Sequence, residues 1–404
     1  MLVELHILQH FAPSNLNRDD TGAPKDCLFG GVRRARISSQ CIKRAIRLYA
    51  QEARLLNPEH RAVRTKRLIG EIARRLAARG RDGHQSQVVA RRMLQSVGIL
   101  PMADAPEKTQ YLLFVGEDEI AQLVALAARR WDDLVASEDE GASEQDQSAA
   151  AGRSRRDRKQ AARAAVPSDI QREVARIFNE ASSAVDLALF GRMIADLPLG
   201  RVDAACQVAH ALSTHQVSVE FDYYTAVDDL LPQETTGADM IGTIEFNSAC
   251  FYRYANVDTD QLEVNLGRRR DLAREGLEAF LRAAIYAVPT GKQNTFAAHN
   301  PPSFVATVVR RRGLWALTNA FVRPVRPTDE RDLVQESIRA LDRYWGKLIS
   351  MYGKEGIDGW WVATHEPEQL ESLRHNPACL VSTVDELVQA TVAKVYGPEA
   401  RDGQ

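Results

Sequence analysis

Residues 2–8 alternate between apolar and polar side chains, with Glu4 and His6 between apolar neighbours. A period of two residues indicates a strand with one buried face. The stretch from Pro13 to Gly31 that follows is rich in Pro, Asn, Asp, Ser and Gly, the residues that favour turns. The pattern therefore predicts a half-buried strand and then a long polar loop.

Helical periodicity covers much of the remaining chain. Ser38 or Ser39 is placed to cap a helix that runs from about residue 40 to residue 56. Pro58 to Ala136 is rich in Arg, Ala and Leu at helical spacing. Further helices are expected at 168–188, 202–212, 328–350 and 384–395. The first and the last of these are opened by capping boxes at Ser168 and Thr383.

Three other segments have the composition of strands. Residues 213–250 are rich in Thr, Val, Tyr, Gly and Asp, which favours a long hairpin or extended arm. Strands are expected at 243–254 and at 304–309. The chain is therefore predicted to be α+β, with a helical insertion early and a hairpin-like arm in the middle.

Residues 137–165 differ from the rest in composition. Five acidic residues lie within 137–147, and six basic residues with one acidic residue lie within 153–163. Such low-complexity sequence cannot bury a core, so we expect a flexible loop here.

Overall composition excludes several classes of protein. Hydrophobic residues make up 45% and charged residues 26% of the 404 residues, and no apolar run approaches the roughly 20 residues of a membrane span. The N-terminus lacks the features of a signal peptide. Five widely spaced cysteines without a CxxC pair argue against a disulfide framework or a zinc site. We therefore expect a cytoplasmic protein without cofactors and without a membrane anchor.

A basic element follows the first loop. Between Cys27 and Gln51 there are six basic residues and no acidic residue: Arg33, Arg34, Arg36, Lys43, Arg44 and Arg47. At about 100° per residue, Ile42, Ala45 and Ile46 share one face of a helix, while Lys43, Arg44 and Arg47 share the adjoining face. The net charge of the whole chain is −2, so any affinity for nucleic acid must come from such local clusters.

Two interpretations of this element remain open. A helix N-terminus attracts phosphate, and unpaired cations are neutralised well by a polyanion, so the element fits a phosphate-backbone site. A solvated basic helix face is the other interpretation, and such faces are common.

A series of ordered motifs resembles one known family. They are SNLNRDD (14–20), KDCLFGG (25–31), RRARISSQCIKRAIR (33–47), ALFGRM (188–193), AHALSTHQV (209–217), DYYTAVDDL (222–230), GTIEFNSACFYRYANV (242–257) and GKQNTFAAHNP (291–301). In this order they resemble the CasC-type backbone subunit of Cascade, the type I-E CRISPR surveillance complex. The resemblance covers most of the chain except residues 137–165 and the last few residues.

The resemblance implies a hand-like architecture. An RRM-like (ferredoxin-like) palm would comprise residues 1–57 and 251–404, helical fingers residues 58–216, and an extended thumb hairpin residues 217–250. Copies of such a subunit line up along the CRISPR guide RNA with other Cascade subunits. The guide then reads target DNA by base pairing, in antiviral defence.

The resemblance also implies roles for single residues. Lys25, Lys43 and Arg47 match contacts to the guide backbone, and Arg18 and Gln40 lie in the same motifs. Met193 matches a residue that wedges beside the guide, and the thumb tip matches the segment that inserts at the kink. The full set expected to bind RNA is Arg18, Lys25, Arg33, Arg34, Gln40, Lys43, Arg44, Arg47, Met193, Tyr224, Thr225, Val227 and Lys292.

Two features depart from the family pattern. The charged insertion at 137–165 is longer than expected, and its basic residues are a candidate for contact with target DNA; a self-neutralising loop is the alternative. These basic residues are Arg153, Arg155, Arg156, Arg158 and Lys159. At Tyr224 an aromatic residue is expected, but not necessarily a tyrosine.

No catalytic or metal site is expected. His210 and His215 are five residues apart, and no GxxxxGK or GxSxG motif occurs. The acidic pairs Asp19–Asp20 and Asp228–Asp229 leave a metal-dependent ribonuclease as the enzymatic alternative. A general single-strand binder that acts without partner subunits is a second alternative.

Overall fold

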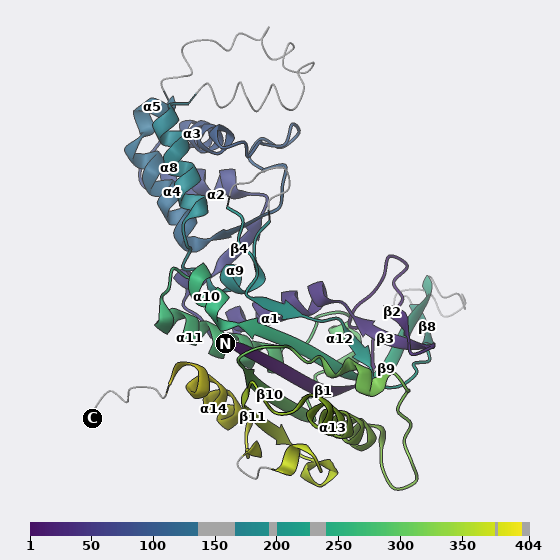
Figure 1. Cartoon of the computed structure of the whole chain (residues 1–404). Coiled ribbons are helices and arrows are strands. Elements are labelled where there is room, and N and C mark those ends of the chain that lie inside the picture. Colours follow the sequence, from purple (N-terminus) through teal and green to yellow (C-terminus); the bar gives the residue numbers. More distant parts are fainter. Residues whose placement is uncertain (136–165, 194–199, 227–239, 376–378, 398–404) are drawn as a thin grey trace, which may run out of the picture. The chain divides into compact units, whose positions relative to one another are not determined.

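The computed structural model describes residues 1–135, 166–193, 200–226, 240–375 and 379–397 (Figure 1). The chain divides into two compact units. The first, called the sheet unit, comprises Met1–Leu55, Cys206–Thr259 and Leu277–Gln404. The second, called the helical unit, comprises Leu56–Ala205 and Asp260–Gly276.

An antiparallel sheet forms the centre of the sheet unit (Figure 1). Its strands are β1 (Leu2–Ser14), β2 (Asp26–Phe29), β3 (Val32–Ile37), β6 (Cys206–Val208), β7 (Ala211–Ser213), β8 (Glu220–Ala226), β9 (Met240–Asp258), β10 (Phe304–Arg310) and β11 (Ile357–Thr364). The main order is β11-β10-β1-β9-β7-β3-β2, and β6 and β8 also pair with β9. The predicted mixed architecture with a long hairpin is therefore confirmed.

Helices cover both faces of this sheet. They are α1 (Ser39–Glu52), the later part of α11 (Arg270–Tyr286), α12 (Gln293–Phe296), α13 (Leu333–Tyr352), α14 (Val384–Tyr396) and the 3-10 helices η3 (Leu317–Phe321), η4 (Pro367–Gln369) and η5 (Leu373–His375). Ile338, Leu341 and Trp345 of α13 join the core on the face of Leu8. Ile42 and Ile46 of α1 meet the opposite face.

Burial of both faces changes the prediction for the first strand. Glu4 and His6, expected on a solvated face, are 0% and 1% exposed. Glu4 accepts a hydrogen bond of 2.6 Å from Nε of Arg310, and His6 Nδ1 lies 2.8 Å from the Tyr252 hydroxyl. Alternating polarity therefore marks a buried polar network here, because buried polar groups require partners.

The helical unit has its own apolar core, formed mainly by its longer helices. Its elements are η1 (Pro58–His60), β4 (Ala62–Thr65), α2 (Leu68–Ala77), α3 (Gly83–Ser96), β5 (Leu113–Gly116), α4 (Glu117–Arg129), α5 (Trp131–Val135), α8 (Ser168–Asn179), α9 (Val185–Phe190), most of α10 (Thr259–Asn265) and the first part of α11. The helical character predicted for residues 58–136 is confirmed for the described residues 58–135, except that β4 and β5 pair as two strands.

Two predicted helices are wrong in part or whole. Residues 202–212 form β6 and β7, which pair with β9, so long-range pairing overrides the local helical pattern. The helix expected at 168–188 is interrupted between α8 and α9. There the Ser182 hydroxyl and the Ser183 amide donate to the Asp118 carboxylate at 2.8 and 2.6 Å, and such side-chain bonds compete with helix formation.

Helix starts were predicted with mixed success. Ser38 caps α1 by accepting from the amide of Cys41 at 3.3 Å, and Thr383 caps α14 by accepting from the amide of Glu386 at 3.1 Å. The capping box at Ser168 is wrong, because Pro167 occupies the cap position and Gln171 donates instead to the carbonyl of Val166.

None of the helices in the described ranges is long and apolar enough to cross a membrane.

Candidate nucleic-acid interface

A polar loop docks onto the start of α1 in the sheet unit. The Ser38 amide donates to Oδ1 of Asn17 at 2.8 Å, and the Lys25 amide donates to the carbonyl of Asn17 at 2.9 Å. Asn17 thereby links the loop to the N-terminus of the helix. The loop and the basic helix, adjacent in sequence, are also adjacent in space.

The faces of α1 are arranged as the pattern predicts. Ile42, Ala45 and Ile46 are buried. Gln40 and Arg44 are exposed, while Lys43 and Arg47 are half-buried. The basic face of the helix therefore lies at the edge of the sheet unit, with its apolar face in the core.

Three cations of this region have no counter-ion among the residues that the structure describes. The side chains of Arg18, Lys25 and Arg44 make no hydrogen bond or ion pair with any residue in the described part of the chain. The charge of Lys25 also acts on a neighbouring histidine. Burial lowers the pKa of His210, and the positive charges of Arg36 and Lys25 lower it as well. Unpaired cations of this kind favour an external polyanion.

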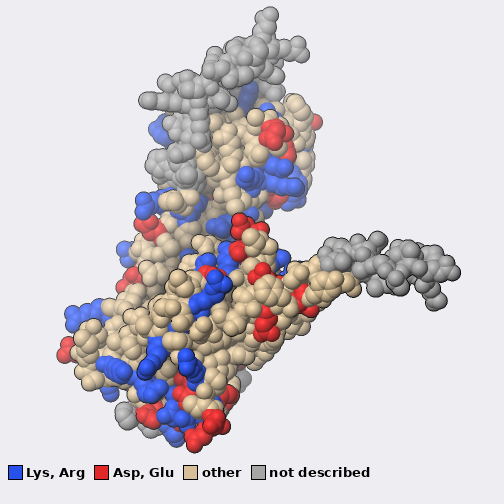
Figure 2. Space-filling view, turned by 90° about the vertical axis from the view of Figure 1, so that its right-hand side faces the viewer, with Lys and Arg blue, Asp and Glu red and all other residues tan. Residues whose placement is uncertain are grey.

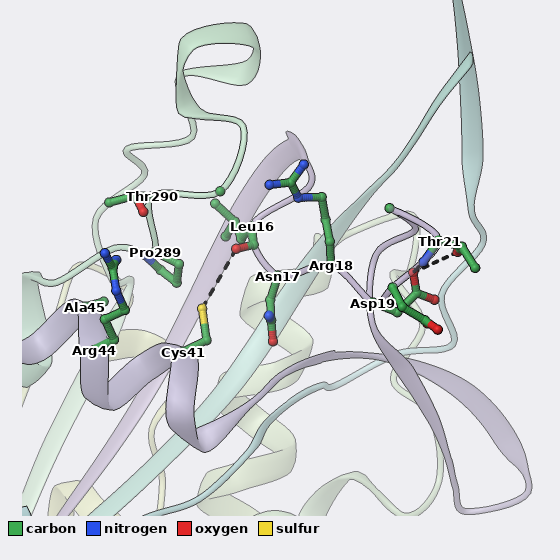
Figure 3. Close-up of a pocket in the computed structure, with 13 residues that line it drawn as sticks. Leu16, Asn17, Arg18, Asp19, Thr21, Cys41, Arg44, Ala45, Pro289 and Thr290 are labelled. Carbon is green, nitrogen blue, oxygen red and sulfur yellow. Dashed lines mark hydrogen bonds between the residues drawn. The ribbon is translucent and has the colours of Figure 1, made fainter. Parts of the chain in front are cut away.

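A pocket of about 550 Å³ opens beside two of these cations, Arg18 and Arg44 (Figure 3). It is lined by the loop from Leu16 to Gly22, by Cys41, Arg44 and Ala45 of α1, and by Pro289, Thr290 and Gly291. Arg44 comes from the helix and Arg18 from the loop across the pocket (Figure 3). The pocket thus presents two guanidinium groups to any ligand that enters it.

The third wall of the pocket depends on a close contact. A Cβ built at Gly291 would lie 2.3 Å from the carbonyl oxygen of Leu16, so only glycine fits here without movement. The next residue, Lys292, adopts a left-handed conformation with φ of 51°, which is uncommon for a residue with a side chain. Lys292 is half-buried and follows directly on the pocket wall.

Asp19 and Asp20 both line the pocket, and Asp19 and the nearby Asp26 have structural partners. Oδ1 of Asp19 accepts from the amide and hydroxyl of Thr21 and from the amide of Ala23, at 2.8–3.0 Å. The Thr21 hydroxyl and these amides lower the pKa of Asp19. Asp26 pairs with Arg33 at 3.1 Å. Among the described residues, no group of three or more His, Cys, Asp or Glu side chains is arranged to hold a metal ion.

Two adjacent arginines have opposite environments. The side chain of Arg33 is 61% exposed. Arg34 is 0% exposed, and its guanidinium donates to the carbonyls of Phe29, Ser213, Phe321 and Val322. The prediction that Arg34 contacts RNA is therefore corrected, because this buried guanidinium donates to backbone carbonyls and is closed off from a phosphate outside.

The predicted thumb residues lie on the hairpin of β8 and β9. Tyr224 is 39% exposed, and its ring lies so close to Gly242 that a Cβ there would be 2.4 Å from the hydroxyl. Thr225 is exposed. Val227 lies outside the described residues, as do Asp228, Asp229 and the insertion at 137–165.

Two aromatic residues of this hairpin were missed. Phe221 and Tyr223 are 67% and 63% exposed, more than Tyr224, and they share the opposite face of β8 because strand side chains alternate. The alternation Glu220-Phe221-Asp222-Tyr223 was the signal that would have found them.

The hairpin differs in charge from the basic residues of the loop and α1. Residues 220–226 and 240–247 contain no Lys or Arg, and three acidic residues: Glu220, Asp222 and Glu245. Figure 2 shows Lys and Arg in several patches with Asp and Glu between them, while the hairpin that leads into a grey segment is mostly tan. Contacts made by the hairpin would therefore be aromatic and apolar rather than phosphate contacts.

Met193 belongs to the helical unit. It follows α9 and is 83% exposed, the highest value among the large hydrophobic residues of the described chain. Methionine side chains usually pack in the hydrophobic core. The exposure of Met193 is therefore unusual for an apolar residue of its unit.

Comparisons with known proteins agree with one another. The chain matches the family model described as CT1975-like protein over residues 3–390. It is similar to a chain of a solved "CRISPR RNA-guided surveillance complex, pre-nicking", with 32% identity, a TM-score of 0.81, and coverage of 97% of this chain and 99% of that chain. A chain of a second solved "CRISPR RNA-guided surveillance complex" has 28% identity and a TM-score of 0.70, with the same coverage. The search of curated proteins found no match.

Proposed function

The chain belongs to the CT1975-like protein family, and on this basis we propose that it is a guide RNA-binding backbone subunit of a CRISPR surveillance complex. The resemblance at the motif level refines the proposal to the CasC-type subunit of the type I-E complex, with an RRM-like palm. Both similar chains belong to CRISPR RNA-guided surveillance complexes, which supports this proposal.

One observation carries the proposal. Arg18 and Arg44 line one pocket, together with Asp19 and Asp20, and neither arginine has a counter-ion in the described chain. The pocket also includes Cys41 in the first turn of α1, whose N-terminus is capped by Ser38. Unpaired cations near a helix N-terminus suit phosphate groups, and phosphate contacts supply most sequence-independent affinity. We therefore assign the guide backbone to this region, held without sequence preference.

The hairpin supplies a different kind of contact. Its exposed aromatic residues and lack of cations suit stacking on bases or packing against a second protein surface. We propose that copies of the chain assemble along the guide through this hairpin, together with other Cascade subunits. The exposed bases would then pair with target DNA, in the cytoplasm and without catalysis by this chain.

The first test uses two exposed arginines. Lys43 and Arg47 are half-buried, so their replacement would also alter contacts within the protein. Arg18→Glu with Arg44→Glu changes side chains that make no ion pair within the described chain. The tagged chain is purified from cells that express its complex and a CRISPR array, and the bound RNA is sized and sequenced.

We expect the wild-type chain to retain a discrete, nuclease-protected population of array-derived RNA. The double variant should lose it while keeping its thermal unfolding transition. A matched control is Arg172→Glu with Arg323→Glu, which reverses two exposed charges that do not line the pocket and should retain RNA. Clean wild-type protein, or RNA of random length and origin, would reject the guide-binding function in favour of no binding or general binding.

The absence of catalysis is tested separately. Purified protein is incubated with RNA complementary to the guide in the presence of Mg²⁺. We expect no cleavage. Cleavage that is lost in Asp19→Ala or Asp26→Ala would overturn the non-catalytic assignment and identify a metal-dependent ribonuclease.

A further inference from the structure

Three cations follow one another along the solvent side of α13. Arg339 is half-buried, and Arg343 and Lys347 are exposed. They recur at intervals of four residues, and each interval advances about 6 Å along a helix and turns by about 40° around it. The three side chains, here called the α13 cation row, therefore lie one after another on one side of the helix.

The α13 cation row has no counter-ion among the described residues. Its three side chains make no hydrogen bond or ion pair within that part of the chain. The two acidic residues of the helix are engaged elsewhere: Glu336 pairs with Arg331, and the buried Asp342 accepts at 2.8–3.0 Å from the amides of residues 371–373. The exposed Glu371 of that segment pairs with none of the three cations.

Such a row works against the helix that carries it. Like charges four residues apart on a helix repel one another. An external anion that binds along the row removes this repulsion, because it supplies the opposite charge that the helix lacks. The row therefore fits a ligand whose own negative charges repeat at short intervals. A nucleic-acid strand is such a ligand, since each nucleotide carries a phosphate.

Exposed apolar side chains continue the row at the C-terminal end of α13. Met351, one further interval of four residues along, is 75% exposed, and Tyr352 is 61% exposed. The centroid of the Tyr352 ring lies 5.9 Å from that of the half-buried Trp315. The helix ends directly afterwards at Gly353, which has φ of 75°. Cations beside aromatic rings are typical of sites for single strands, because the cations hold phosphates while bases stack on the rings.

The α13 cation row is separate from the pocket beside α1. Helices α13 and α1 cover opposite faces of the sheet (Figure 1). No residue of α13 lines the pocket. A strand held in the pocket would have to pass around the edge of the sheet to reach the row, so the row is a second site.

We infer that the α13 cation row, with Tyr352 at its end, binds a second single-stranded nucleic acid through its phosphates and without sequence preference. This goes beyond the proposed guide-binding function, because it concerns a further strand on the other face of the sheet. A single strand fits better than a duplex, since the exposed ring of Tyr352 stacks on bases that are unpaired or terminal. An acidic protein surface is the competing ligand, and the experiment separates the two.

The second site is tested in a chain whose pocket is disabled. Full-length chain with Arg18→Glu and Arg44→Glu is titrated with fluorescein-labelled oligo(dT) of about 20 nucleotides, a length above the usual site size for a single strand. Binding is followed by fluorescence anisotropy. We expect this variant to bind the oligonucleotide. Addition of Arg343→Glu and Lys347→Glu should weaken the binding by about tenfold or more, since two phosphate contacts become repulsive.

Further variants in the same background separate phosphate contacts from stacking. Arg343→Gln with Lys347→Gln should lower the slope of log K against log salt concentration by about 1.4, at about 0.7 for each contact, and is the pair to use if the glutamate pair does not fold. Tyr352→Ala should weaken binding and leave the slope unchanged. The matched control is Arg172→Glu with Lys394→Glu, which reverses two exposed charges outside α13 and should bind as the background does.

Three results would overturn the inference. The background variant does not bind oligo(dT), or it binds equally well with and without the α13 substitutions. In the third, Arg343→Glu with Lys347→Glu leaves oligo(dT) binding unchanged but removes a protein from the purified complex, which makes the row a protein interface. The titration uses DNA and a disabled pocket, so it does not depend on guide retention. Wild-type chain without guide RNA would therefore overturn the proposed function alone.

Discussion

Gly291 lies against the backbone of Leu16 in the wall of the pocket, so closely that a side chain at position 291 would not fit. A Cβ at 291 would lie 2.3 Å from the carbonyl oxygen of Leu16 and 2.8 Å from that of Asn15. These residues are about 275 positions apart in the sequence. Their contact brings the segment that precedes Lys292 against the loop that carries Arg18.

Replacement of this glycine should weaken RNA binding. In Gly291→Ala the added methyl group forces the two loops apart, which we expect to destabilise the protein by about 1–3 kcal/mol, as overpacking does. RNA affinity should fall because the pocket wall moves. Chemical denaturation and RNA titration measure the two effects. Gly83→Ala in α3 is the control, since a Cβ there meets no atom within 4 Å, and equal losses in both variants would contradict the prediction.

The neighbours Arg33 and Arg34 should respond differently to the same substitution. Arg34→Met removes a buried donor from four backbone carbonyls, and two of these hydrogen bonds are buried and two part-buried. It should lower the free energy of unfolding by roughly 2–4 kcal/mol. Arg33→Met removes an exposed side chain paired with Asp26 and should change stability by about 0.5 kcal/mol or less. Urea unfolding of the two variants provides the measurement. RNA retention per folded Arg34→Met molecule should match wild type, and a selective loss of RNA without loss of stability would restore Arg34 as a binding residue.

Binding should depend on salt through identifiable side chains. Each phosphate contact to a single strand adds about 0.7 to the slope of log K against log salt concentration. Arg18→Gln and Arg44→Gln should each reduce the slope by about that amount, and the double variant by about twice as much. The RNA affinity is measured between low and moderate salt with homopolymers of different sequence. Unchanged slopes with weaker binding would mean that these arginines act through the protein fold and not through phosphate.

Acid should destabilise the sheet unit through His6. Complete burial, together with the charge of Arg310, lowers the pKa of His6 from its ordinary value of 6.5 to about 3. The unfolded chain therefore binds a proton between pH 6.5 and pH 3 that the folded chain does not. Stability from this residue is present above pH 6.5 and is lost as the pH falls toward 3, with a slope of up to about 1.4 kcal/mol per pH unit.

The variant His6→Asn isolates this effect. Burial raises the pKa of Glu4 and lowers the pKa values of His10 and His215, so the wild-type pH profile contains several contributions. The difference between wild type and His6→Asn should shrink as the pH falls from 6.5 to 3 in urea unfolding of RNA-free protein. His299→Asn, which replaces an exposed residue, should follow wild type. A pH-independent difference for His6→Asn would show that the histidine is not neutral in the fold.

The sequence by itself determined the features that depend on neighbours a few residues apart. The apolar face of α1, the cap at Ser38, the cap at Thr383 and the hairpin within 213–250 were all predicted and are confirmed. Helical faces and caps are set by residues three or four positions apart, so a local pattern is sufficient. The basic cluster is likewise visible as a run of cations without acidic residues.

Only the tertiary structure decided which of those residues face solvent and which distant segments meet. Glu4 and His6 look like the outer face of a strand, but α13 and the polar network around Arg310 and Tyr252 bury them. Residues 202–212 have a helical pattern, but they form β6 and β7 because both segments pair with the edge of β9. Burial and pairing between segments hundreds of residues apart outweigh local propensities of a few tenths of a kcal/mol per residue, and for that reason no local pattern separates Arg33 from Arg34 or joins Leu16 to Gly291.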